Sequence, residues 1–334
     1  PMVDWKEMLF KDYTSNQRGN INISGGGRVA RYYIALSYAR DNGILKVDPV
    51  NSFNNNIQLN KYTVRSNINM NLTKTTELAV RVSGTFDDYQ GPISGGADMY
   101  NKAIKANPVL FPATYKADEA HKYANHILFG NSGEGGEYMN PYAEMLRGYK
   151  ESETTVIIAQ LELKQNFDFI TKGLKGRVLG NVTRNAAYDL TRAYTPFYYS
   201  IGSYDKYTDT YTLSDLNADS GTDYLNFTPG GKSVESALYL EASLAYDRIF
   251  KEKHNVSGML VYTVRENKTA NAGSLIASLP GRNMGLAGRF TYGLLDRYFA
   301  EFNFGYNGSE RFDRNNRWGF FPSGGFGWMV SNEP

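Results

Sequence analysis

The chain has 334 residues, a formal charge of +2 at pH 7 and no cysteine. The balanced charge gives no support for nucleic-acid binding, and the lack of cysteine excludes disulfides, thiolate metal sites and cysteine nucleophiles. Its 26 tyrosines, 18 phenylalanines and 33 glycines favour an all-β architecture over a helical bundle.

The first segment, residues 1–10, carries acidic and polar residues throughout and does not have the pattern of a signal peptide. We therefore expect it to lie inside a longer protein. The longest aliphatic run, residues 156–159, is far shorter than the roughly 20 residues of a membrane-spanning helix. A strand with one apolar face can still cross a membrane, because alternation keeps its mean hydropathy low.

The first four predicted strands cover residues 19–24, 30–40, 62–72 and 77–86. The glycines of the turn at 25–29 are not followed by Lys-Ser/Thr or a clear helix, so they indicate a turn rather than a phosphate loop. The third and fourth strands alternate between apolar and polar residues, and their polar faces include Arg65 and Arg81. Charged side chains in the middle of strands suit the wet lumen of a barrel.

Two further hairpins are predicted, one from residues 154–167 and 174–184 and one from 236–247 and 254–264. Lys164 and Arg177 fall on the polar face of the first hairpin, opposite leucine, isoleucine and valine. A soluble β-sandwich also alternates in this way, so alternation alone does not separate the two classes.

The last three predicted strands cover residues 285–293, 297–308 and 318–331, with Arg289 on the polar face of the first. Between residues 298 and 307 the apolar positions are Tyr298, Ala300, Phe302, Phe304 and Tyr306, and the polar positions include Glu301 and Asn303. Only Phe299 breaks the polar set. A strand of about ten residues with one aromatic-rich face suits a transmembrane barrel wall.

These patterns assign two groups of wall residues. We expect Tyr298, Phe302, Phe304 and Tyr306 to face lipid. We expect Arg65, Arg81, Lys164, Arg177, Arg289 and Glu301 to face the lumen.

The connections alternate between short turns and long loops along about eleven strands, as in outer-membrane barrels with short periplasmic turns and long extracellular loops. The long connections are predicted over residues 41–61, 87–153, 185–235, 266–284 and 309–317. The first and last strands would leave two open edges, which a bilayer cannot hydrate. We therefore expect strands outside this chain, or another copy, to close the barrel.

The long loops supply the candidate binding residues. The aromatic residues Tyr194, Phe197, Tyr198, Tyr199, Tyr204, Tyr207 and Tyr211 cluster in one loop. Aromatic faces with hydroxyl tips can stack on sugar rings or pack against a partner protein. Packing within the loop, or an outer aromatic girdle, explains the same cluster. A short helix over residues 98–105 would suit contact with a lipoprotein.

No metal, cofactor or catalytic site is expected. His121 and His126, with Glu134 and Glu137 nearby, do not have the i, i+4 spacing of a helical metal pair and indicate a solvated loop. The acidic series Asp215, Asn217, Asp219, Gly221 and Asp223 lacks the glycine and glutamate that an EF-hand needs at its sixth and twelfth positions. It indicates a polar hairpin tip, although outer loops can bind Ca²⁺ in other geometries. No catalytic triad or carboxylate pair is evident, so we expect no enzyme activity.

Four stretches carry a family resemblance. Residues 281–333 (GRNMGLAGRFTYGLLDRYFAEFNFGYNGSERFDRNNRWGFFPSGGFGWMVSNE) look like a central barrel segment of the SusC/RagA-type TonB-linked outer-membrane transporters. Residues 4–10 (DWKEMLF), 20–41 and 167–176 (FDFITKGLKG) resemble the same family, in the family's order. The intervening loops match little.

The resemblance implies an antiparallel transmembrane β-barrel of about 22 strands in the outer membrane of a Gram-negative bacterium, of the Bacteroidota. Residues 1–334 would form part of that barrel, without the plug, the TonB box and the C-terminal strands. The implied partners are a SusD-like surface lipoprotein, TonB through the missing N-terminal region, outer-membrane lipid, and the remaining barrel and plug segments. The lumen-facing charges would then contact the plug.

The function implied is TonB-dependent import of large nutrients, glycans or peptides. Two other classes remain open at this point. A secreted or surface all-β binding or adhesion module would fold without detergent, and a passive porin would lack a plug and a TonB box.

Overall fold

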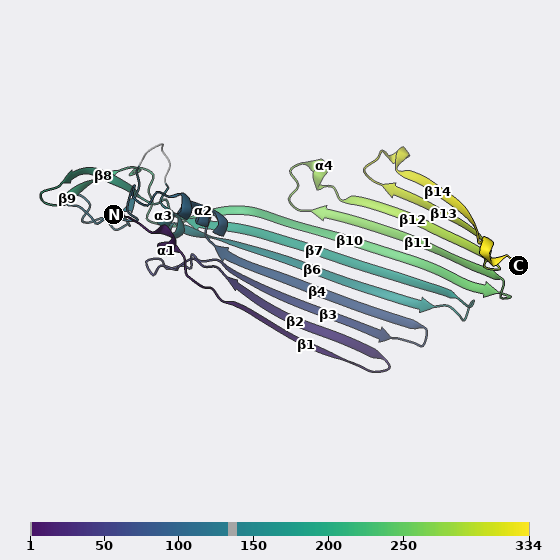
Figure 1. The fold of residues 1–334 in the computed structure, drawn as a ribbon. Helices are drawn as coiled ribbons and strands as arrows, with labels where there is room; N and C mark the ends of the chain where they lie inside the picture. Colours follow the sequence, from purple (N-terminus) through teal and green to yellow (C-terminus); the bar gives the residue numbers. More distant parts are fainter. Residues whose placement is uncertain (1, 133–138, 334) are drawn as a thin grey trace.

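The computed structural model describes residues 2–132 and 139–333. Within these residues the dominant feature is an 11-stranded antiparallel sheet with the order β1-β2-β3-β4-β6-β7-β10-β11-β12-β13-β14 (Figure 1). Strands β5, β8 and β9 form a separate sheet, and each strand of the large sheet otherwise pairs with its neighbours in chain order. This meander confirms the predicted fold class. The described strands leave β1 and β14 as the two edges of an open sheet.

The large sheet is built from strands of very different length. They are β1 (Asn16–Gly26), β2 (Ala30–Asn42), β3 (Gln58–Asn71), β4 (Thr76–Gly91), β6 (Gly148–Asn166), β7 (Leu174–Ala193), β10 (Asn226–Phe250), β11 (His254–Thr269), β12 (Gly281–Leu294), β13 (Tyr298–Ser309) and β14 (Trp318–Trp328). The last ends before the predicted residue 331, because the chain turns into a 3₁₀ helix, η3 (Val330–Asn332).

The strands extend further toward the long connections than predicted. The prediction of loops is wrong for several ranges that belong to strands of the large sheet: residues 41–42, 58–61, 87–91, 148–153, 185–193, 226–235, 266–269, 281–284 and 309. With 25 residues, β10 is roughly 80 Å long, whereas the apolar band of a barrel is about 25 Å tall. Polar residues occupy both faces of these extensions. The hydrophobic alternation therefore stops while backbone pairing continues, as between Glu235 and Asn185.

The short turns have a geometry that fixes the register of the hairpins. Lys251 and Glu252 in the β10–β11 turn, and Leu295 and Asp296 in the β12–β13 turn, all have positive φ angles, as tight hairpin loops require. Gly173 has a φ of 90°, and a Cβ there would lie 1.9 Å from the carbonyl oxygen of Asp247. Only glycine can therefore bring the turn between β6 and β7 this close to β10.

The outer lobe comprises residues 2–15, 43–57, 92–132, 139–147 and 194–225 and lies at the ends of the long strands (Figure 1). It contains α1 (Trp5–Leu9), α2 (Gly96–Lys105), α3 (Pro141–Leu146), β5 (Phe129–Gly130), β8 (Tyr198–Asp205) and β9 (Thr210–Asp215). The predicted short helix at 98–105 is confirmed as α2. The lobe has the principal hydrophobic core among the described residues, formed by Trp5, Leu9, Leu45, Met99, Phe111, Phe129, Met145, Leu146, Tyr198 and several alanines.

Buried side-chain amides and caps hold the lobe together. Asn140 caps α3 by accepting hydrogen bonds from the backbone N–H groups of Tyr142 and Ala143. Its own amide nitrogen donates to the carbonyl oxygens of Ala113 and Gly130, each at 2.8 Å. One buried asparagine thus connects the helix to β5 and to the preceding segment.

The remaining elements are short helices between strands, α4 (Leu275–Ser278) and η2 (Arg314–Asn316). Over residues 2–132 and 139–333, no helix has both the length and the apolar character needed to cross a membrane.

Candidate functional site

The register of the large sheet decides which side chains share a face, because residues paired across antiparallel strands lie on the same side. The paired residues include Arg65 with Ser83, Arg177 with Lys164, and Arg289 with Asn303. Followed from strand to strand, the pairs place six predicted residues on one face, called here the polar face: Arg65, Arg81, Lys164, Arg177, Arg289 and Glu301. The opposite, apolar face carries Tyr298, Phe302, Phe304 and Tyr306.

The polar face is crossed by a ladder of ion pairs, called here the charge ladder. Arg81 on β4 lies 2.8 Å from Glu162 on β6, and Glu162 lies 2.6 Å from Arg177 on β7. Arg177 continues the ladder to Glu241 on β10 at 2.5 Å. Glu162 is almost fully buried beneath these cations. Two arginines on the same carboxylate compensate the cost of burying its charge.

Further charges on the polar face are paired or surround a hollow. Arg289 and Glu301 form an ion pair of 2.7 Å between β12 and β13. Near the short turns, a hollow of about 820 Å³ is lined by several cations and by the carboxylate of Glu77. The cations are Arg28, Lys74, Lys164, Lys175 and Arg177. This excess of positive charge would attract an acidic surface.

The apolar face has large side chains that no other layer covers among the described residues. Val178 is 55% exposed and Leu161 is 53% exposed, although both lie in the middle of the sheet. Aromatic rings continue this face, with Tyr306 stacked on Trp318 at 4.9 Å between centroids. In a water-soluble protein a continuous apolar surface of this kind marks a membrane or protein contact.

The predicted loop aromatics divide into a buried and an exposed set. Tyr198 belongs to the main core of the lobe, and Tyr199 is only 3% exposed in a second core with Leu128 and Leu213. Tyr194, Phe197 and Tyr211 pack against these two cores. Their rings therefore hold the lobe together. Tyr204 and Tyr207 are 58% and 88% exposed near the turn between β8 and β9, where they can contact a ligand or partner.

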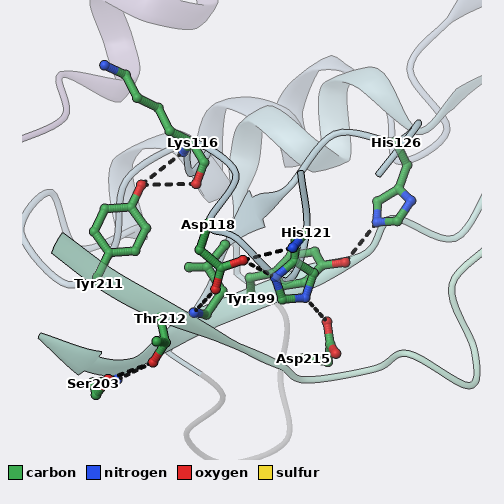
Figure 2. A network of polar contacts seen from close by, with 10 residues as sticks. Lys116, Asp118, His121, His126, Tyr199, Ser203, Tyr211, Thr212 and Asp215 are labelled. Carbon is green, nitrogen blue, oxygen red and sulfur yellow. Dashed lines mark hydrogen bonds and ion pairs between the residues drawn. The ribbon is translucent and has the colours of Figure 1, made fainter. Parts of the chain in front are cut away.

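The histidines and acidic residues of the lobe form a hydrogen-bonded network rather than a recognisable metal centre (Figure 2). The described residues hold no group of three or more His, Cys, Asp or Glu side chains that could bind a metal ion. Asp215 contacts His121, and Asn217 hydrogen-bonds the backbone of Tyr198 and Pro196. Glu134 and Glu137 lie outside the described residues.

Sequence reasoning missed the carboxylates on which these networks depend. Glu241 and Glu162 complete the charge ladder, and Asp118 anchors the lobe network. The sequence signal for both glutamates is their position inside a predicted strand, on the polar face and close to basic residues of the neighbouring strands, which predicts ion pairs. Asp118 has no comparable signal, because its partner Leu213 is distant in sequence.

The chain is similar to known proteins over its whole length, although no model of a protein family matches it. It is 23% identical over 365 residues to TonB-dependent receptor P3 of Formosa agariphila, covering 99% of this chain and 32% of that protein. It is 21% identical to TonB-dependent receptor SusC of Bacteroides thetaiotaomicron, again covering 99% of this chain and 32% of that protein. The chain thus spans about a third of the length of these relatives.

Solved structures agree on the fold. The structure of the RagAB peptide transporter matches 100% of this chain and 36% of its own chain, with a TM-score of 0.60 and 16% identity. The open-open state of the RagAB peptide importer matches 97% of this chain with a TM-score of 0.59 and 16% identity.

Proposed function

We propose that this chain, a barrel segment of the SusC/RagA type of TonB-dependent transporter, forms part of the wall of an outer-membrane importer of large nutrients. The two faces of the large sheet carry this proposal. One face exposes valine, leucine and aromatic side chains, and the other carries paired charges. A wall between lipid and a wet lumen requires this division.

The proposed location is the outer membrane of a Bacteroidota species, the setting of the similar receptors from Formosa and Bacteroides. Lipid would contact the apolar face, including Phe302 and Phe304. The remaining strands of the barrel would pair with the open edges β1 and β14, because unpaired backbone groups are costly in a bilayer.

The proposed partners follow from the two ends of the molecule. At the short-turn end, the basic hollow on the polar face supports contact with an acidic surface of the plug. At the outer end, the lobe offers α2 and the exposed Tyr204 and Tyr207 for a SusD-like lipoprotein or for substrate. TonB would act through the N-terminal region of the longer protein.

The proposed substrates are glycans or peptides, and transport is mechanical rather than catalytic. Substrate would be captured at the outer lobe and enclosed by the lipoprotein, after which TonB would displace the plug. The charge ladder supports this role, because paired charges give a hydrated wall without strongly attracting one sign of solute. The RagAB protein is named a peptide transporter, which supports peptides as the substrate of this chain, and the similarity to the TonB-dependent receptor SusC supports TonB-dependent uptake.

The exposed apolar face opposes the secreted adhesion module, which would have to bury this face between two sheets. The passive porin is distinguished by transport energetics. Deletion of the full-length gene should abolish uptake of labelled oligosaccharides or peptides, while small sugars still enter. Dissipating the inner-membrane proton gradient should have the same effect in the parent strain. Uptake that continues at the same rate without the gradient would support a porin and refute the importer.

A further inference from the structure

The side chain of His121 lies between two carboxylates in the outer lobe (Figure 2). Its Nδ1 is 2.5 Å from Oδ1 of Asp118, and its Nε2 is 3.3 Å from Oδ1 of Asp215. A neutral imidazole has one N–H donor and one lone pair, whereas an imidazolium ring donates from both nitrogens. Because an ionised carboxylate only accepts hydrogen bonds, this arrangement is satisfied by the protonated ring.

The two carboxylates belong to different parts of the lobe. Asp118 precedes His121 in the segment 115–126 and also accepts the backbone N–H of Leu213 in β9 at 2.8 Å. Asp215 is the last residue of β9. Bonds to Asp118 and Asp215 therefore make His121 a connection between the segment 115–126 and the β8–β9 hairpin.

We propose that His121 is a proton-dependent clamp, which in its charged form holds the β8–β9 hairpin against residues 115–126 and releases Asp215 when it loses a proton. The contact with Asp118 is the shorter and more buried one, so Nδ1 keeps its proton and Nε2 loses its own. The Nε2 lone pair then faces the Asp215 carboxylate and repels it. The clamp thereby controls how firmly the hairpin presents Tyr204 and Tyr207 to the outside.

The groups around His121 favour its charged form. Burial by itself lowers the pKa of His121, but the hydrogen bonds and negative charges of Asp118 and Asp215 outweigh burial and raise it. Burial opposes ionisation of Asp118 as well. The backbone N–H of Leu213 and the contact with His121 outweigh that effect and lower the pKa of Asp118.

The other titratable groups of the network either keep their protonation state near neutral pH or have a pKa shifted in the opposite direction from that of His121. The Tyr199 ring packs edge-on against His121, with centroids 5.1 Å apart, and burial together with the charge of Asp215 raises its pKa to about 12. His126 accepts or donates at 2.8 Å to the Tyr199 hydroxyl, and burial lowers its pKa despite the nearby charge of Asp223. The segment 115–126 and the hairpin also carry Tyr115, Lys116, the exposed ion pair of Lys122 and Glu119, and Tyr211, whose hydroxyl hydrogen-bonds the backbone of Lys116.

The direction of the pH dependence follows from these shifts. His121 has a raised pKa, so its stabilisation of the lobe is complete below the unfolded-state pKa and is lost as pH rises through the folded-state value. Asp118 has a lowered pKa, so its stabilisation is lost only in strong acid. His126 has a lowered pKa, so its stabilisation is lost as pH falls below its unfolded-state pKa. Alkaline loss of the contact with Asp215 is therefore attributable to His121, while Asp118 still accepts from Leu213 and Tyr211 still bonds the backbone of Lys116.

The test is hydrogen exchange by mass spectrometry on the full-length transporter from about pH 6 to about pH 9, across the range where histidines titrate. Protection factors, which remove the intrinsic pH dependence of exchange, are followed for peptides from β8 and β9. In the wild-type protein we expect protection to fall about tenfold with rising pH, the loss expected for one charge-assisted hydrogen bond. In His121→Gln the same peptides should have low protection without a pH-dependent step.

Two further variants keep the test decisive if His121→Gln disturbs folding. His254→Gln removes the histidine outside the lobe, at the start of β11, and should retain the wild-type step. Asp215→Asn replaces the carboxylate beside His121 with an amide that can accept from the protonated ring and donate to the neutral ring, so it should remove most of the pH-dependent step. A constant protection factor in the wild-type protein, or a step of wild-type size in Asp215→Asn, would overturn the proposal. This readout does not depend on transport, so it is separate from the proposed function.

Discussion

The outer lobe and the large sheet treat their apolar side chains in opposite ways. In the lobe, Leu9, Leu146 and Met99 are completely enclosed by protein. In the sheet, Val178 and Leu161 are about half exposed although they lie in the central strands β7 and β6. The lobe therefore folds as a water-soluble protein does, whereas the sheet depends on a nonaqueous surrounding to cover its apolar face. The two regions of one chain are therefore suited to different surroundings, water for the lobe and a nonaqueous phase for the apolar face of the sheet.

The largest expected effect comes from removing a core side chain of the lobe. Leu146→Ala should destabilise the lobe by about 2–5 kcal/mol, because the substitution leaves a cavity among fully buried neighbours. Hydrogen exchange of the full-length protein should show the loss in α1, α2 and α3 while β11–β13 stay protected. An equal loss of protection in these strands would show that the two regions unfold together and would contradict their description as separate regions.

A charge on the apolar face tests the other region. Phe304→Lys should oppose folding into the bilayer by about 2–4 kcal/mol if residue 304 lies near the midplane. Asn303→Lys is the matched control, because its side chain points to the polar face. Folding of the full-length protein into lipid vesicles at increasing urea concentration measures both. Equal tolerance at the two positions would refute the assignment of the faces.

The Asn140 cap is expected to have an intermediate effect confined to the lobe. Asn140→Ala removes the cap of α3 and leaves the carbonyl oxygens of Ala113 and Gly130 without their amide donor, at a cost of about 1–3 kcal/mol. Increased exchange in α3 and β5 measures this change. Asn140→Asp retains the capping oxygen but turns its second carboxylate oxygen toward the carbonyl oxygens of Ala113 and Gly130 in a buried site, so it should be no more stable than Asn140→Ala.

The charge ladder should contribute less, because its arginines are partly exposed to solvent. Glu162→Gln is expected to destabilise the sheet by about 1–2 kcal/mol, after allowance for screening of Arg81 and Arg177. High salt should reduce the difference between the variant and wild type. A difference that is independent of salt would mean that Glu162 acts through packing rather than charge.

The sheet was largely predictable from its sequence because its pairing is local. Alternation from Tyr298 to Asn307 identifies two faces, and the short turns bring each strand back beside its predecessor. The extensions of β7 and β10 escape this reasoning, since polar residues such as Asn185 and Glu235 follow no apolar periodicity. These extensions are strands because the adjacent strands of the sheet run alongside them and pair with their backbone.

The lobe could not be predicted in the same way. Phe129 and Tyr198 pair in parallel across a long stretch of chain, and no local pattern encodes such a contact. The cluster of tyrosines suggested ligand binding or packing, and only burial separates Tyr199 from Tyr207. The contact of His121 with Asp215 likewise depends on the placement of β9.

The position of α1 in the lobe has a consequence for the order of folding. Trp5 and Leu9 share a core with Met145, Leu146 and Tyr198, so this core joins residues that are far apart in the sequence. Strand pairing in the sheet instead joins neighbouring hairpins. Contacts between distant residues form slowly, because the entropy cost of closing a long loop comes before the contacts stabilise the structure. We therefore expect the lobe to be the last region to fold, after most of the hairpins that support it have been formed.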